Sequence, residues 1–126
     1  MTIDERIRFI KAFKTLASHP KYIKDFEAFT VIHRDLFTDG IHSGNYFLPW
    51  HRWYMLTFEN MVRQVDCRNT LPYWDWAFWS NAAWTENVHL WNSNDHGFGG
   101  NGDPNRGYCV QDGPFREGKC IKSASV

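Results

Sequence analysis

The stretch Phe47–Asn60, FLPWHRWYMLTFEN, decides how the chain folds. Pro49 suits the first turn of a helix, because the N–H that proline lacks would have no partner there. Counting from His51, apolar residues recur at steps of four, three, four and three, at Met55, Phe58, Val62 and Val65. This spacing predicts a helix from about Pro49 to Val65, with His51 in line with its buried face. A buried imidazole needs a partner, and that partner is either a backbone carbonyl or a metal ion.

Two more helices are predicted before this stretch. Thr2 and Glu5 have capping-box spacing and begin a helix that reaches about Ala17. Ser18-His19-Pro20 then ends that helix and starts another, with Ser18 as candidate cap and Pro20 in the first turn. Along the second helix one face is formed by Tyr22, Phe26, Phe29, His33 and Phe37, so His33 is expected to be buried as His51 is. Asp39-Gly40 stops this helix.

Beyond Cys67 the helical period is lost. Residues 71–76 are expected to be extended or turn-like, and the chain from about Ser80 onward is expected to be mostly ordered loop, with a short helix near 82–87. The sequence therefore predicts one mainly α-helical domain over residues 1–126, with three helices in 1–67 and a loop-rich segment in 68–126. A loop segment of this length is expected either to be functional or to wrap against another part of the protein.

Composition excludes several classes of function. Fourteen basic and fourteen acidic residues balance, so nothing indicates a nucleic-acid or anionic-membrane partner. No apolar run approaches the roughly 20 residues needed to cross a bilayer. Three cysteines allow one disulfide and leave one cysteine over, and none has the C-x-x-C spacing of a zinc ribbon. The cysteines slightly favour a secreted or extracellular protein, and the opening without a signal-peptide pattern leaves an intracellular protein or a mature segment as alternatives.

Three histidines carry the chemistry that the sequence suggests. His33, His42 and His51 follow one another at nine-residue intervals. Two belong to the inward faces of adjacent antiparallel helices and the third to the loop between them, so their imidazoles can meet at one point. Five aromatic side chains are expected to keep water away: Phe29, Phe37, Phe47, Trp50 and Phe58. With three nitrogen donors and no carboxylate or thiolate, copper and zinc are the leading metals. The alternative is three histidines that are satisfied separately.

The remaining histidines are weaker candidates. His19 competes with His33 for a ligand position, but its place beside Pro20 favours a cap or surface role. His89 and His96 lie seven residues apart in a Gly/Asn-rich stretch, which is typical of surface loops.

Two carboxylates are assigned more loosely. Asp75 lies between two tryptophans and is expected to pair with Arg52, to orient a ligand imidazole, or simply to form a turn. Glu59 and Arg63 are four residues apart and form a surface ion pair. Residues 97–102, GFGGNG, match a dinucleotide-binding pattern only formally, because no strand precedes them and no helix follows, so they indicate a turn-rich loop.

Several segments together resemble the type 3 copper proteins, which are the tyrosinases, catechol oxidases and molluscan-type haemocyanins. These segments are HPKYIKDFEAFTVIH (19–33), FLPWHRWYMLTFEN (47–60), PYWDW (72–76), GGNGD (99–103) and CVQDGPF (109–115). The resemblance implies the helical-bundle half of a tyrosinase-like dicopper domain, with His33, His42 and His51 as ligands of the first copper. It also implies oxidation of phenols or catechols to o-quinones by O2. The interval between His33 and His42 is shorter than in many members of the family.

The sequence departs from the family at the second copper. That copper takes three further histidines from a later helix pair, including an H-x-x-x-H motif, and residues 1–126 hold no such motif. The resemblance therefore implies that the site is completed by a two-fold homodimer or by a chain that carries the second-copper half. Two alternatives are a module that binds copper and O2 without turnover and a scaffold that has lost its chemistry.

Overall fold

The computed structural model describes residues 1–79, 89–94, 96–100 and 102–116. Its elements are α1 (Ile3–Ser18), α2 (Ile23–Asp35), α3 (Phe47–Val65), α4 (Trp76–Trp79), the 3-10 turns His89–Trp91 and Pro104–Arg106, β1 (Gly102–Asp103) and β2 (Cys109–Val110). The fold is mainly α, as predicted. The short helix expected near 82–87 lies outside the described residues.

The chain divides into two compact units. One is Lys11–Leu71, and the other combines Met1–Ile10 with Pro72–Val126. The assignment of residues 1–126 to one domain stays a prediction. Among the described residues, no helix has both the length and the apolar character needed to span a bilayer.

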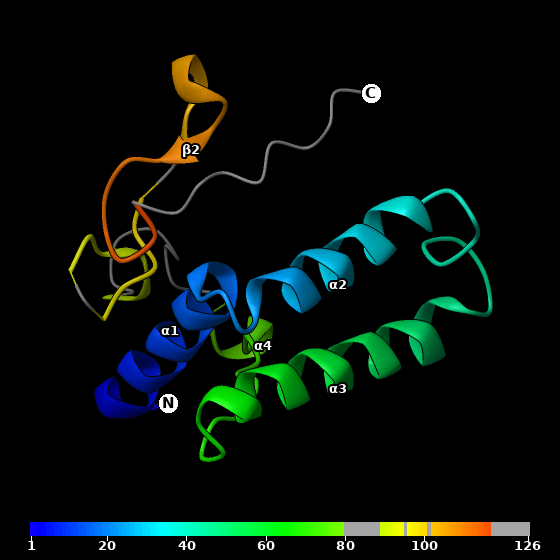
Figure 1. Cartoon of the computed structure of the whole chain (residues 1–126), viewed down its shortest axis with the longest axis horizontal. Coiled ribbons are helices and arrows are strands. Elements are labelled where there is room, and N and C mark those ends of the chain that lie inside the picture. Colours follow the sequence, from blue (N-terminus) through cyan, green and yellow to red (C-terminus); the bar gives the residue numbers. More distant parts are fainter. Residues whose placement is uncertain (80–88, 95, 101, 117–126) are drawn as a thin grey trace. The chain divides into compact units, whose positions relative to one another are not determined.

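Aromatic side chains hold the Lys11–Leu71 unit together. Figure 1 shows α2 and α3 side by side and antiparallel, joined by the turns of residues 36–46. Phe29 of α2 stacks on Tyr54 of α3 with ring centroids 4.0 Å apart and on Phe58 at 5.7 Å. Phe13 of α1 meets Phe58 edge to face, also at 5.7 Å. The buried side chains of this unit include Ala12, Leu16, Phe26, Phe29, Ile41 and Val62.

Helix ends differ from the predicted ones by a few residues. α2 begins at Ile23, so the predicted start at Pro20 is wrong. The reason is a turn after His19, whose Nδ1 accepts the Lys21 N–H at 3.2 Å and whose carbonyl accepts the Ile23 N–H at 3.0 Å. Ser18 does not cap α2, because it is the last residue of α1 and its hydroxyl donates to the Lys14 carbonyl at 2.7 Å.

The start of α3 is also earlier than predicted. It begins at Phe47 and ends at Val65, so Pro49 still falls in the first turn, where it removes no helical hydrogen bond. The capping box at Thr2 and Glu5 is confirmed, because each residue's N–H donates to the other's side chain, at 2.7 and 3.2 Å.

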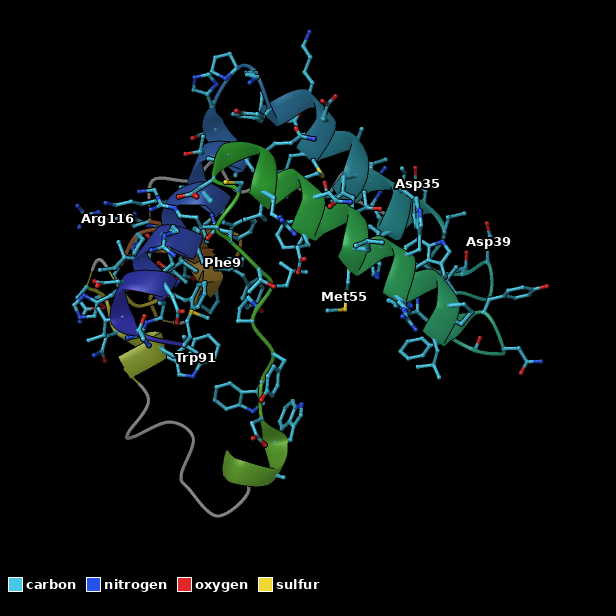
Figure 2. The ribbon with its side chains drawn as sticks, turned by 90° about the horizontal axis from the view of Figure 1, so that it is seen from below. Phe9, Asp35, Asp39, Met55, Trp91 and Arg116 are labelled. Carbon is cyan, nitrogen blue, oxygen red and sulfur yellow. The ribbon has the colours of Figure 1, made fainter. Side chains whose placement is uncertain are left out.

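Two residues that the spacing placed on buried faces are exposed. Phe37 is 58% exposed because α2 ends at Asp35 and helical geometry no longer sets the direction of its side chain. Met55 is 53% exposed, and Figure 2 shows it projecting from α3 on the side away from α2. Its neighbour Tyr54 occupies the packed face instead, so the prediction for Met55 was wrong by one position around the helix.

The other unit is held by close backbone approach and a carboxylate. β1 pairs with β2 in antiparallel register, Gly102 opposite Val110. The Asp112 carboxylate accepts the Ser93 hydroxyl at 2.6 Å and the Gly100 N–H at 2.8 Å, and both bonds lower the pKa of Asp112. Gly113 has φ +71°, and a Cβ there would lie 2.8 Å from the Gly99 Cα, so only glycine fits without a shift. The GGNGD and CVQDGPF segments therefore bind each other.

Cysteine usage agrees with the predicted count of one disulfide. Cys109 is disulfide-bonded, whereas Cys67, just after α3, is free and exposed. Cys120 lies outside the described residues.

Truncating Val62 and Met55 tests which face of α3 is packed. Val62 is fully buried, so Val62→Ala is expected to lower the free energy of unfolding by about 2 kcal/mol through lost burial and a residual cavity. Met55→Ala removes an exposed side chain and is expected to change it by less than about 0.5 kcal/mol. Urea unfolding followed by circular dichroism measures both, and equal losses would contradict the assigned face.

Candidate metal centre

The fold brings three histidines together from three adjacent segments. His33 lies in the last turn of α2, His42 in the connection between the helices, and His51 in the second turn of α3. One nitrogen from each ring can be chosen so that all three atoms lie within 4.8 Å of one another. The convergence expected from the nine-residue spacing is therefore present.

Backbone carbonyls orient two of the rings. His42 Nδ1 lies 3.2 Å from the Phe37 carbonyl oxygen, and His51 Nδ1 lies 2.8 Å from the Phe47 carbonyl oxygen. A carbonyl can only accept, so each Nδ1 must carry a proton and donate it, and in the neutral ring this leaves Nε2 with a free lone pair. This is the tautomer that a metal ligand needs. The carbonyl partner and the metal partner, which the sequence left as alternatives, are compatible because they use different nitrogens.

The rings are angled so that their nitrogens face one another. His33 lies at 79° to His42 and at 80° to His51, and the ring centroids of the three are 4.9–5.5 Å apart. His33 Nε2 and His42 Nε2 are 3.2 Å apart, and with His42 protonated on Nδ1 it is His33 that donates the Nε2 proton of this hydrogen bond, a proton that leaves when a metal binds. Three inward nitrogens with no carboxylate or thiolate among them suit copper or zinc.

Three of the five aromatic residues predicted to shield the histidines lie beside them, whereas Phe29 and Phe58 pack on Tyr54, Phe13 and Phe26. Phe37 lies 4.2 Å from the His42 ring, Phe47 lies 4.5 Å from the His51 ring, and Trp50 lies 5.7 Å from the His33 ring. The enclosure is one-sided, however. Phe37 and Phe47 are 58% and 41% exposed, and all three histidines are only half-buried.

Burial favours the neutral form of His33, which is the form that binds a metal. Desolvation lowers the pKa of His33, and the neighbouring His42 and His51 lower it further. Each effect disfavours the imidazolium form. Because a metal binds neutral imidazole, the environment favours the form that can act as a ligand.

The sequence reasoning missed Tyr54. Its hydroxyl donates to the Phe29 carbonyl at 3.2 Å, between α3 and α2, and burial raises its pKa, so it remains a donor. Trp50, Tyr54 and Phe58 recur at steps of four along α3, and this aromatic spacing was the available signal.

The other candidate histidines lie elsewhere. His19 is exposed and its ring accepts the Lys21 N–H in the turn before α2, which agrees with the predicted surface role and not with a helix cap. Within the described part of the chain, neither His19 nor His96 belongs to the histidine cluster. His89 begins a 3-10 turn, and its side chain is not among those that the structure describes.

Glu59 does more than the predicted ion pair. Its carboxylate lies 3.8 Å from the Arg63 guanidinium, as expected, but it also accepts the Leu71 N–H and the Thr70 hydroxyl, each at 3.0 Å. The Leu71 bond is the main reason that the pKa of Glu59 is lowered. Glu59 therefore fastens the segment after α3 to the helix. Asp75 and Arg52 belong to different units, so the expected pairing between them stays a prediction.

Comparison with known proteins decides the family. Residues 23–124 match the common central domain of tyrosinase. The chain belongs to the tyrosinase family. It is 37% identical to the tyrosinase ustQ of Aspergillus flavus and 35% identical to a tyrosinase of Streptomyces glaucescens, in each case over 91% of this chain. It is 37% identical to the grixazone synthase of Streptomyces griseus, again over 91% of this chain.

The matched region is only part of each relative. It covers 34% of the Aspergillus flavus protein, 40% of the Streptomyces glaucescens protein and 37% of the grixazone synthase. The tyrosinase family is a family of copper enzymes, and the three clustered histidines are consistent with a copper site. Copper is therefore the metal that the family and the donor set share.

The lowered pKa of His33 predicts how the stability of the metal-free protein depends on pH. Unfolding returns His33 to an ordinary pKa of about 6.5, so below that pH the unfolded state binds more protons than the folded state. The free energy of unfolding is expected to be highest above pH 6.5 and to fall as the pH drops through it. In His33→Gln the fall is expected to be shallower, as measured by urea unfolding between pH 5 and pH 8, and parallel curves would contradict the assignment.

Proposed function

We propose that this chain is the first-copper part of an oxidoreductase that oxidises phenols or catechols to o-quinones with O2. The observation that supports the proposal most directly is the cluster of three histidine nitrogens within 4.8 Å. Membership of the tyrosinase family supports copper, phenolic small molecules and O2 as its reactants.

In this proposal His33, His42 and His51 are the copper ligands. The carbonyls of Phe37 and Phe47 accept the Nδ1 protons of His42 and His51, so that Nε2 of each ring would be the atom that binds copper. Copper, when bound, supplies the electron transfer with O2. The protein supplies the ligand geometry, and the surrounding aromatic rings restrict water on the helix side of the site.

A dicopper site needs a second set of ligands. The surface near the three histidines is apolar, which indicates that another polypeptide segment covers it. Large apolar side chains of the same unit are exposed around the cluster and along α3: Ile32, Phe37, Tyr46, Phe47, Leu48, Trp53, Met55 and Leu56. A lone soluble domain rarely exposes so many neighbouring apolar residues. We propose that another polypeptide segment covers this surface and brings the second copper. A second copy related by a two-fold axis, or a segment that carries the second-copper half, would supply it.

Copper titration of the ligand variants tests the first part of the proposal. The wild-type chain is expected to bind one copper per three-histidine cluster. Replacement of His33, His42 or His51 by alanine is expected to weaken binding by more than about a hundredfold, because losing even an indirect partner of a ligand costs 10–100-fold. Competition with a chelator of known affinity measures the change.

His19→Ala is the matched control, since it removes an imidazole that lies outside the cluster and is expected to keep wild-type copper affinity. Unaltered copper binding in all three cluster variants would refute the assignment.

Association tests the second part of the proposal. Leu56, 58% exposed on α3, is replaced by glutamate to place a charge on the proposed contact surface, and Lys24→Glu on exposed α2 surface is the control. Leu56→Glu is expected to lower the mass measured by sedimentation and to abolish quinone formation from a catechol, while copper binding to the cluster persists. Full catechol oxidation by a monomer would contradict the proposal, and O2-dependent near-ultraviolet absorption without quinone would indicate a carrier.

A further inference from the structure

Tyr54 is the point where α3 is tied to the backbone of α2 nearest the histidine cluster. Its hydroxyl donates to the Phe29 carbonyl at 3.2 Å, and its ring lies almost parallel to that of Phe29, at 8° and 4.0 Å. On its other neighbour along α3, Trp50, it stacks at 16° and 4.9 Å. One side chain therefore makes a polar and an apolar contact that together fix how the two helices are spaced and rotated.

The carbonyl that Tyr54 binds belongs to the turn that carries His33. Phe29 precedes His33 by four residues in α2, so its carbonyl is the one that the His33 N–H reaches in an α-helix. The Tyr54 ring also lies 5.3 Å from the His33 ring, and Trp50 lies 5.7 Å from it. A shift of Tyr54 would thus move both the backbone and the ring of His33.

His33 depends on such support more than the other two histidines do. His42 and His51 each have a carbonyl bond from Nδ1 that fixes the ring within its own segment. In the described part of the chain, the hydrogen bond of the His33 ring is the one to His42, and its remaining ring neighbours are aromatic. It is also the cluster's member from α2, so its position relative to His51 is set by the packing of α2 on α3.

We propose that Tyr54 is a positioning residue for the metal centre, which holds His33 at the distance from His42 and His51 that a three-imidazole copper site requires. The proposal rests on the proposed copper function. Tyr54 touches neither the metal nor the substrate in this role, and it acts through the Phe29 carbonyl and through contact with the His33 ring.

The test compares Tyr54→Phe and Tyr54→Leu in the full chain loaded with one equivalent of Cu(II). Tyr54→Phe keeps the stack and loses the hydrogen bond, so copper affinity is expected to fall about fivefold. Tyr54→Leu also loses the stack, so a fall of at least about tenfold is expected, together with an altered electron paramagnetic resonance spectrum of Cu(II). The graded order of the two variants is part of the prediction.

Val62→Ala separates positioning from general stability. Val62 lies on α3, is fully buried and is not a ring neighbour of the histidines, so this variant is expected to unfold more easily but to keep wild-type copper affinity and spectrum. If both Tyr54 variants bind copper as the wild type does, with an unchanged spectrum, the positioning role is wrong. The positioning role is also wrong if Val62→Ala changes copper affinity and the spectrum as much as the Tyr54 variants do.

A measurement on the metal-free protein tests the positioning role separately from the proposed copper function. The His33 and His42 ring centroids are 4.9 Å apart, so nuclear Overhauser contacts between the two imidazoles are expected in metal-free wild type and in Val62→Ala. They are expected to weaken in Tyr54→Leu. A wild type that shows these contacts but binds no copper defeats the proposed function alone, whereas contacts that persist in Tyr54→Leu defeat the positioning role alone.

Discussion

Phe29 of α2 and Tyr54 of α3 stack with ring centroids 4.0 Å apart, and this contact helps set the spacing of the two helices that carry His33 and His51. Phe58 continues the stack one turn further along α3, at 5.7 Å from Phe29, and Trp50 continues it toward the histidines. Aromatic rings are suited to this purpose because they bury much area and have few rotatable bonds. His33 on α2 and His51 on α3 can then meet without any covalent link between the helices.

The histidine cluster is less favourable for folding than a purely apolar contact would be. Three imidazoles are partly desolvated, and their nitrogens face one another at short distance, which explains why the pKa of His33 is lowered. Carbonyl bonds from Phe37 and Phe47 offset part of this cost for two of the rings. A bound metal would offset it further, because it satisfies all three lone pairs at once. Local stability is given up here for a preorganised set of donors.

The sequence predicted the helices and the converging histidines because both depend on regular spacing. Apolar residues at helical steps located α1, α2 and α3 to within a few residues, and the nine-residue intervals placed His33, His42 and His51 together. Helix ends were less accurate where a side chain overrode the pattern, as at His19, whose ring accepts the Lys21 N–H and delays α2. The exposure of Met55 and Phe37 could not be predicted from the spacing of apolar residues alone, since burial depends on which neighbours cover a helix face. Tyr54 was missed because its donor bond to Phe29 spans 25 residues.

The exposed apolar residues and the half-buried histidines have one physical explanation. The proposed oxidation of a phenol by O2 would work best in a site with little water, where charges interact strongly. On the helix side, Trp50, Tyr54 and Phe29 provide such surroundings, but Phe37 and Phe47 touch the histidines with one face and meet solvent with the other. Apolar residues that contact the histidines so closely are poorly suited to face solvent permanently. They are suited to be an inner wall, which supports the proposal that the second half of the site covers the side on which they are exposed.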